Sequence, residues 1–146
     1  MASVVFEKSI GGNVKARRVL VSYTELVTAG ASQNISLGTA LPSGAILMGA
    51  RYILKTVFTS GSITGITAEV GTSADTDGIL TAGELLSGSP AAGSERAVEG
   101  VGVGVSAATP LIRFTASGAN LGDGSATALT AGAIYVDLVY VALPTF

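Results

Sequence analysis

Carboxylates carry most of the chemistry open to this sequence, because the chain contains no Cys, no His and no Trp. Disulfides are therefore excluded, and so are thiol and imidazole nucleophiles, bases and metal ligands. Glu69, Glu84, Glu95 and Glu99 offer the residue type for glycoside hydrolysis. Sugar sites usually present aromatic platforms, however, and all four Tyr residues fall within predicted strands, where core packing is the default. We therefore expect no enzyme, no cofactor and no small-molecule substrate.

An acidic motif, Asp75-Thr76-Asp77-Gly78, has the carboxylate spacing that opens a calcium-binding loop. Nothing at the right distance serves as the closing bidentate Glu, and no helix–loop–helix pattern surrounds the motif. Asp and Gly are also the residues that a polar turn requires. We interpret the motif as a turn and predict no metal site there or at Asp123, which lies between two glycines.

A glycine-rich stretch, residues 100–104, alternates Gly and Val. Its spacing does not match the dinucleotide-binding fingerprint, and no Lys-Ser/Thr pair follows it. We predict a pliable edge strand or a contact loop instead of a phosphate site.

Nucleic acid and membranes are not expected partners. The net charge of −2 gives no general attraction to nucleic acid. The most apolar run, residues 134–143, is interrupted by Asp137 and is far shorter than the ~20 residues of a spanning helix. Residues 1–12 contain an apolar run of only Val4, Val5 and Phe6, so we expect no secretory signal. The absence of Cys fits synthesis in a cytoplasm.

A long strand from Ala45 is the element around which the rest is organised. Its residues alternate in character, and both charges, Arg51 and Lys55, fall on the odd-numbered face. This period of two predicts a strand with its even-numbered face in a core. That face comprises Ile46, Met48, Ala50, Tyr52, Leu54, Thr56 and Phe58. The Ser60-Gly61-Ser62 turn then leads into a second strand that ends at Gly71.

Other strands are predicted at 18–27, 33–37, 98–105, 110–116 and 133–142. A single helical turn is expected over 79–86, where Thr81 and Glu84 are spaced as a capping box. Long loops are expected at 87–104 and 118–131. Short strands with frequent turns and no long helix indicate one all-β domain, an antiparallel β-sandwich, a jelly roll or a β-barrel.

The first residues form no clear element and are unusually basic, with a net charge of +3 over residues 1–18. We predict a flexible N-terminal arm at 1–16, followed by a β-sandwich domain at 17–146. A frayed terminus and an edge strand of the protein's own sheet are the alternatives. As an arm, the segment would bind a partner through an apolar hook and neighbouring cations: Val4, Val5, Phe6, Lys8, Lys15, Arg17 and Arg18.

Charged residues make up only 12% of the chain, against the usual ~25%. A monomer with so few charges would have difficulty staying dispersed. We infer that other subunits or a lattice cover part of its surface. The alternative is an ordinary β-sandwich that is poor in charge.

Residues 42–80 carry a family resemblance. A Leu41-Pro42-Ser43-Gly44-Ala45 turn precedes the long strand, and residues 70–78, Val-Gly-Thr-Ser-Ala-Asp-Thr-Asp-Gly, follow the hairpin. This arrangement resembles a recurring segment of structural proteins of tailed bacteriophages, and among these the capsid decoration (auxiliary, or cement) proteins.

The resemblance implies a β-rich virion protein, made in the host cytoplasm, that binds the outside of the capsid as an oligomer, typically a trimer. Its expected partners are copies of itself and the major capsid protein, and its expected role is to stabilise the shell. The alternative is a carbohydrate- or receptor-binding β-module of a head fibre or tail. That alternative predicts an exposed aromatic or carboxylate cluster in the 87–104 or 118–131 loops, and neither loop contains an aromatic residue.

Overall fold

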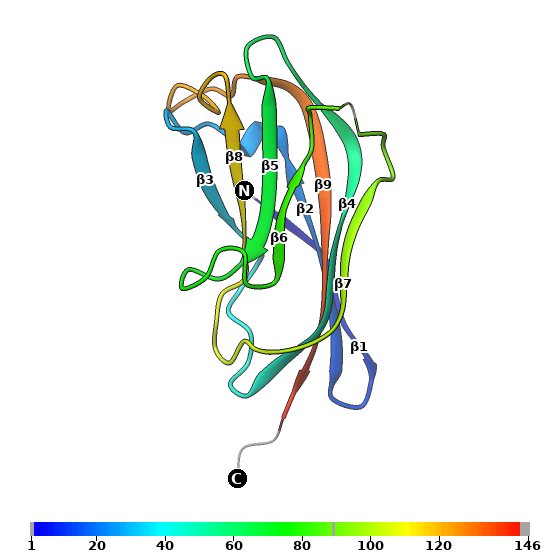
Figure 1. Ribbon diagram of the computed structural model, residues 1–146. Helices are drawn as coiled ribbons and strands as arrows, with labels where there is room; N and C mark the ends of the chain where they lie inside the picture. Colours follow the sequence, from blue (N-terminus) through cyan, green and yellow to red (C-terminus); the bar gives the residue numbers. More distant parts are fainter. Residues whose placement is uncertain (1, 89, 144–146) are drawn as a thin grey trace.

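Two antiparallel sheets packed face to face make up the protein (Figure 1). The structure is a computed structural model that describes residues 2–88 and 90–143, with the backbone alone over 96–103. One sheet has five strands in the order β1-β2-β9-β4-β7, and the other has four in the order β3-β8-β5-β6. The strands are β1 (Ser3–Gly11), β2 (Val14–Ser22), β3 (Ser32–Ser36), β4 (Ala45–Ser60), β5 (Gly65–Gly71), β6 (Leu80–Glu84), β7 (Glu95–Gly104), β8 (Leu111–Ser117) and β9 (Leu129–Ala142).

The predicted all-β antiparallel sandwich is confirmed, and the barrel alternative is not, because the two sheets stay open and separate. A short 3-10 helix (Tyr23–Glu25) follows β2, so the strand predicted at 18–27 ends earlier, at Ser22. There the Ser22 backbone N–H donates to the Glu25 carboxylate at 2.9 Å. That bond satisfies a backbone group which the strand would otherwise have paired.

The hydrophobic core lies between the sheets and is built by alternate residues of each strand. On β9 the buried face is the uncharged one that the sequence predicts: Ile134, Val136, Leu138 and Tyr140 are at most 1% exposed. Residues of the four-stranded sheet, such as Ile66 and Phe114, meet them with no exposed surface. Burial of alternate side chains from both sheets is the main stabilising contribution expected of a sandwich.

Strand β4 departs from the predicted alternation at its start and again at Thr56, which was expected in the core but is exposed. Ala50, Tyr52, Leu54 and Phe58 point into the core as expected, but Met48 is 46% exposed and Leu47 is fully buried. The pairing of β4 with both neighbours shifts register between residues 47 and 49. This β-bulge adds one residue and so exchanges the two faces of the strand, which corrects the prediction for Ile46 and Met48.

The segment 79–86, expected to form a helical turn, is instead strand β6 over most of its length. Leu80 pairs with Val70 and Glu84 with Thr67 across β5. The Glu84 carboxylate accepts hydrogen bonds from the backbone N–H groups of Ile66 and Ser87 at 3.0 and 2.7 Å. The residue taken as a helix cap therefore closes a strand pair, because long-range pairing outweighs a local capping signal weakened by a neighbouring glycine.

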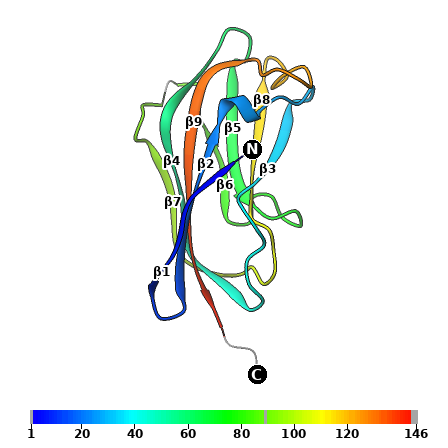
Figure 2. The ribbon, with the colours of Figure 1, turned by 180° about the vertical axis from the view of Figure 1, so that it is seen from behind.

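The N-terminal segment expected as a flexible arm is the edge strand β1, the alternative that the sequence left open. It pairs antiparallel with β2 from Ser3↔Leu20 to Gly11↔Val14 (Figure 2). The turn is possible because Gly12 adopts a positive φ of 54° beside Asn13, a combination typical of tight hairpins. The boundary predicted between residues 16 and 17 falls inside β2.

Gly132 provides a test of the core packing. Its φ is +143°, and a Cβ atom there would overlap the ring of Phe58, which is only 2% exposed. Gly132→Ala should therefore destabilise the fold by about 1–3 kcal/mol through overpacking, measured by urea unfolding. The control is Gly61→Ala, where a Cβ atom meets nothing within 4 Å. Equal stability of the two variants would contradict the packing described for Phe58.

Candidate partner-binding surface

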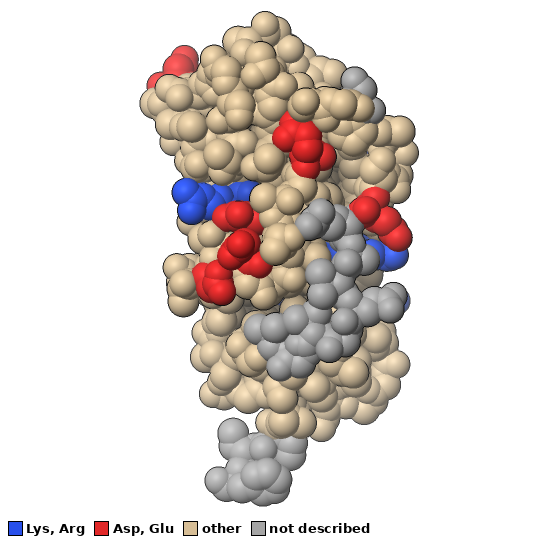
Figure 3. All heavy atoms as spheres, viewed as in Figure 1, with Lys and Arg blue, Asp and Glu red and all other residues tan. Residues whose placement is uncertain are grey.

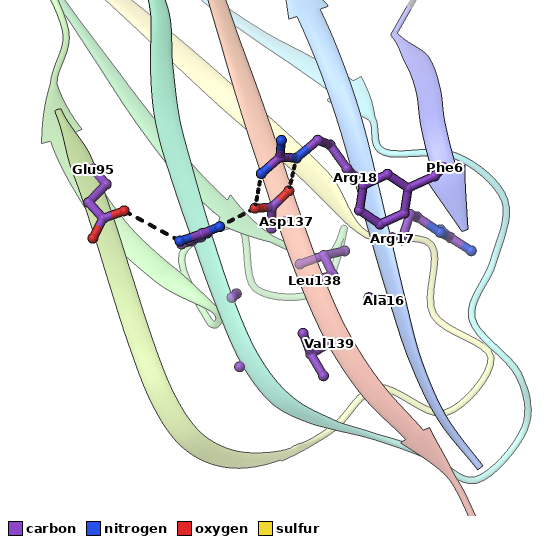
Figure 4. Close-up of a pocket in the computed structure, with 11 residues that line it drawn as sticks. Phe6, Ala16, Arg17, Arg18, Glu95, Asp137, Leu138 and Val139 are labelled. Atoms are coloured by element: carbon purple, nitrogen blue, oxygen red, sulfur yellow. Dashed lines mark hydrogen bonds and ion pairs between the residues drawn. The ribbon is translucent and has the colours of Figure 1, made fainter. Parts of the chain in front are cut away.

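A row of alternating charges crosses the outer face of the five-stranded sheet (Figure 4). Arg18 on β2 donates two hydrogen bonds to Asp137 on β9, at 2.7 and 2.8 Å. Arg51 on β4 donates to the same carboxylate from the other side at 2.9 Å. Arg51 also lies 3.5 Å from the carboxylate of Glu95 on β7. Four strands are thus linked by one ionic row.

Strand register positions this row. Arg18 and Arg51 are the Cα partners of Asp137 on its two sides, so all three side chains leave the sheet on the same face. Burial raises the pKa of Asp137, but the hydrogen bonds and charges of the two arginines outweigh it, and the pKa lies below its ordinary value. The Asp137 side chain is 16% exposed, so this pairing is partly shielded from solvent.

Aromatic rings extend the same surface. The guanidinium of Arg18 lies 4.8 Å from the ring centroid of Tyr135 and 5.9 Å from that of Phe6. The ammonium groups of Lys8 and Lys55 lie 5.2 and 5.3 Å from the Phe6 and Tyr135 centroids respectively. These distances are in the range of cation–π attraction. Phe6 on the edge strand is thereby joined to the centre of the sheet.

A trough of about 380 Å³ lies beside the ionic row. Arg18, Asp137, Arg51 and Glu95 line it on one side, and Phe6 also borders it. Ala16 and Gly49, which flank Val139 in neighbouring strands, supply small side chains or none. The trough therefore combines a border of mutually paired charges with an apolar floor, as protein–protein interfaces combine a polar rim with an apolar centre.

A second ionic cluster, on the inner side of the sheet, holds β1 in place. Arg17 is 2% exposed and donates to the carbonyls of Leu37 and Thr39 at 3.0 and 2.8 Å and to Glu7 at 2.9 Å. The Tyr140 hydroxyl also donates to Glu7. Burial raises the pKa of Glu7, but the hydrogen bonds from Tyr140 and Arg17 lower it by more. The pKa of Glu7 therefore lies below its ordinary value.

The predicted partner-binding residues divide between these two clusters. Phe6, Lys8 and Arg18 come together on the outer face. Arg17 is internal and engaged with Glu7. Val4 and Val5 on the edge strand are 46% and 50% exposed, and Ile10 nearby is 53% exposed. Lys15 is exposed on β2, next to Ala16.

Sequence reasoning missed Asp137, Arg51 and Glu95 as members of a site. Arg18 and Arg51 lie 119 and 86 residues away from Asp137 along the chain, and only the pairing of β2, β9 and β4 brings them together. One signal was present: Asp137 is a single charge within an otherwise uncharged strand. A lone charge on the solvent-facing side of a strand indicates a cross-strand partner.

Among the side chains that the structure describes, the other sequence candidates form no comparable site. Asp75 and Asp77 are exposed in the turn after β5, and a hydrogen bond to Asp77 raises the pKa of Asp75. The Thr76 hydroxyl donates to Glu69 at 2.7 Å. Across the described residues, no group of three or more Asp, Glu, His or Cys is arranged to hold a metal ion. The glycine-rich 100–104 stretch belongs to strand β7, which pairs with β4.

No helix in the described part of the chain has the length and apolar character needed to cross a bilayer.

The fold is shared with proteins of two solved phage capsids. A chain of the cyanophage Pam1 capsid asymmetric unit is similar with a TM-score of 0.60 and 23% identity, over 94% of this chain and 89% of that one. A chain of the capsid of Ralstonia phage GP4 is similar with a TM-score of 0.50 and 20% identity, over 94% and 90%. At these identities the likeness shows the fold, and it agrees with the resemblance of residues 42–80 to phage structural proteins.

No known family profile matches the sequence, and no curated protein matches it.

Removal of Arg17 tests the inner cluster. Arg17→Ala would leave the partly buried Glu7 carboxylate without its cation and two carbonyls without their donor. We expect a loss of about 3 kcal/mol in the free energy of unfolding, because breaking one side of a buried pair is costly. The control is Lys15→Ala, exposed on the same strand, which should change stability by less than about 0.5 kcal/mol. Similar effects of both variants would refute the buried anchor.

The outer row predicts a pH dependence. Because the pKa of Asp137 is lower in the folded chain than in the unfolded one, its contribution is present above the unfolded value of about 3.9 and is lost as the pH falls through the folded value. Asp137→Asn should reduce stability by about 1–3 kcal/mol at pH 7, and the difference from the wild type should shrink below pH 4. Urea unfolding across pH 2–7 measures this. A constant difference over that range would contradict the assignment.

Proposed function

We propose that this chain is a non-enzymatic structural protein of a phage virion that decorates the outside of the capsid as a homo-oligomer, with a trimer as the expected form. The observation that carries the proposal is the shared fold, which covers 94% of this chain and 89% of a chain from the cyanophage Pam1 capsid asymmetric unit. The major capsid protein is the proposed partner, and the outer surface of the virion the proposed location.

The chemistry of the surface supports a binding role. The chain has no Cys and no His, and 12% of its residues are charged. Large apolar side chains are nevertheless exposed, and four of the six in the described part lie on one edge strand: Val4, Val5, Phe6 and Ile10. A protein–protein interface would remove these groups from water.

The edge strand β1 is the proposed contact with a neighbour. One of its edges pairs with β2, and in the described structure no strand pairs with the other. An unpaired edge offers main-chain donors and acceptors to an added strand, and apolar side chains next to it would supply affinity. Lys8, Lys15 and Arg18 would add charge steering, while Arg17 acts from inside by anchoring β1 through Glu7.

A decorating protein stabilises its shell by mass action, because it binds the assembled lattice and not its separated parts. Each contact would need on the order of 1,000 Å² of buried surface to persist. The alternative is a carbohydrate- or receptor-binding module. It is less well supported, because neither the 87–104 loop nor the 118–131 loop contains the Phe, Trp or Tyr that would form an aromatic platform.

Binding to phage heads tests the proposal. Heads of the phage that carries this gene, prepared without this protein, are mixed with the purified chain and sedimented. We expect saturable co-sedimentation, a rise in the temperature at which the heads rupture, and an oligomer by light scattering. A monomer at high concentration that leaves the heads unaltered would overturn the proposal.

The contribution of β1 is tested with a pair of matched variants. Val5→Ser and Met48→Ser each remove one exposed apolar side chain, 50% and 46% exposed in the two positions. Val5→Ser should weaken head binding at least several-fold and Met48→Ser should not, while circular dichroism shows both folded. If the two variants bind heads equally well, β1 is not part of the interface.

A further inference from the structure

The outer face of the four-stranded sheet is mainly polar. Strand register places polar and charged side chains in two neighbouring rows on it: Ser32, Thr115 and Thr67, then Asn34, Arg113 and Glu69. Figure 3, which views the molecule from this side, shows several carboxylates there. Water satisfies side chains of this kind, so this face needs no partner.

The outer face of the five-stranded sheet is divided into stripes. The ionic row of Arg18, Asp137, Arg51 and Glu95 crosses its middle (Figure 4). The pairing of β2, β9 and β4 places aliphatic and aromatic side chains in register on both sides of that row: Leu20, Tyr135 and Ile53 on one side, and Val14, Val141 and Ile46 on the other. All six are only half-buried. An ionic stripe thus lies between two apolar ones, and the chain itself covers none of the three completely.

The signs within the ionic row alternate across four strands. From β2 to β7 they are positive, negative, positive and negative, so the row has no net charge. Such a row is complementary to a reversed copy of itself, because reversal exchanges every sign. Arg18 then meets Glu95 of the second copy, and Asp137 meets Arg51 of the second copy. The match depends on the order of the charges and requires no excess of either sign.

Symmetry selects one arrangement of two facing copies. A twofold axis between the sheets and along the row would place Arg18 against Arg18 and Asp137 against Asp137. An axis along the strands reverses the row and also keeps each apolar stripe opposite its own copy. Like charges in contact exclude the first arrangement and not the second.

We infer that the outer face of the five-stranded sheet binds a second copy of this chain face to face, across a twofold axis that runs along the strands between β9 and β4. The contact is isologous: β9 of each copy lies over β4 of the other, and β2 over β7. The apolar stripes supply affinity, and the ionic row fixes the orientation. Sheets that pack in this way keep their strands within about 30° of each other, and the long Arg and Glu side chains can follow that rotation.

The trough gives this contact a place for Met48. The bulge in β4 leaves the Met48 side chain 46% exposed beside Gly49. Because β4 lies over β9 of the second copy, Met48 stands opposite the floor of that copy's trough, where Ala16 and Gly49 flank Val139. A flexible, unbranched side chain is suited to occupy part of this irregular hollow of about 380 Å³.

The edge strand β1 stays outside the contact. With the axis between β9 and β4, β1 lies beyond the edge of β7 of the second copy and is not covered. The twofold contact is therefore additional to the one proposed for β1 and does not depend on it. Where β1 joins copies into a trimer, the twofold contact would join copies of neighbouring trimers.

Glu95→Lys tests the ionic row. Glu95 is 54% exposed, so its loss should affect the fold little, but an ammonium would then face Arg18 of the second copy twice in each contact. We expect the dissociation constant of the twofold contact to rise at least about 10-fold, measured by sedimentation equilibrium. Asp77→Lys is the matched control, because it makes the same change in charge on the exposed loop after β5. It should stay within about twofold of the wild type.

Mixing two variants tests the orientation. Arg18→Glu should weaken the contact as Glu95→Lys does, since a carboxylate then faces Glu95 of the second copy. A mixture of Arg18→Glu chains with Glu95→Lys chains should associate again, because both facing pairs become opposite in sign. Circular dichroism checks that each variant is folded. No association between the two folded variants would overturn the orientation.

Met48→Ser is a second probe that leaves the ionic row intact. It should weaken the twofold contact several-fold, and it should leave head binding unchanged because β1 lies outside this contact. A twofold contact as strong in Met48→Ser as in the wild type would contradict the placement of Met48 in the trough.

The outcomes separate this inference from the proposed function. A Glu95→Lys chain that loses the twofold contact and still binds phage heads supports both. Self-association that is indifferent to Glu95→Lys refutes the inference and leaves the decorating role intact. Head binding lost by Glu95→Lys with self-association unchanged assigns this face to the shell and also refutes the inference.

Discussion

Strand β9 imposes the constraint on which the rest of the structure depends. It lies between β2 and β4 at the centre of the five-stranded sheet, and its two faces meet different environments. Its inner face, from Ile134 to Tyr140, is almost fully buried against the second sheet. Its outer face has one charge, Asp137, which ties two neighbouring strands together through their arginines. A slip of one residue would place Asp137 in the core and apolar side chains in water, so the register is strongly fixed.

The edge strand β1 depends on the same centre. Tyr140 at one end of the buried face donates to Glu7, and Arg17 brings that carboxylate together with the carbonyls of Leu37 and Thr39. On the outer face, Phe6 lies over Arg18. The strand is therefore held from both sides of the sheet while most of its own surface remains exposed. This combination of a fixed backbone and unburied apolar groups is what a protein–protein contact requires.

Charge is the second organising feature. With few ionic groups in the chain, their placement matters more than their number. The outer face of one sheet bears the alternating row of Arg18, Asp137, Arg51 and Glu95, and that of the other is mainly polar. Ion pairs at the exposed surface of one chain contribute modestly to its stability. The alternation of signs can direct association between copies and exclude poorly matched partners.

The sequence by itself determined the fold class and the buried face of β9, because a period of two in apolar residues is a local property of a strand. It also indicated the exposed hook at Val4, Val5 and Phe6. Tertiary structure alone decided that residues 3–11 pair as an edge strand, that 80–84 is a strand despite its capping signal, and that a bulge at Met48 exchanges the faces of β4. It alone assembled Arg18, Asp137 and Arg51. The physical reason is that strand pairing joins residues about a hundred positions apart, and no local pattern specifies which strands become neighbours.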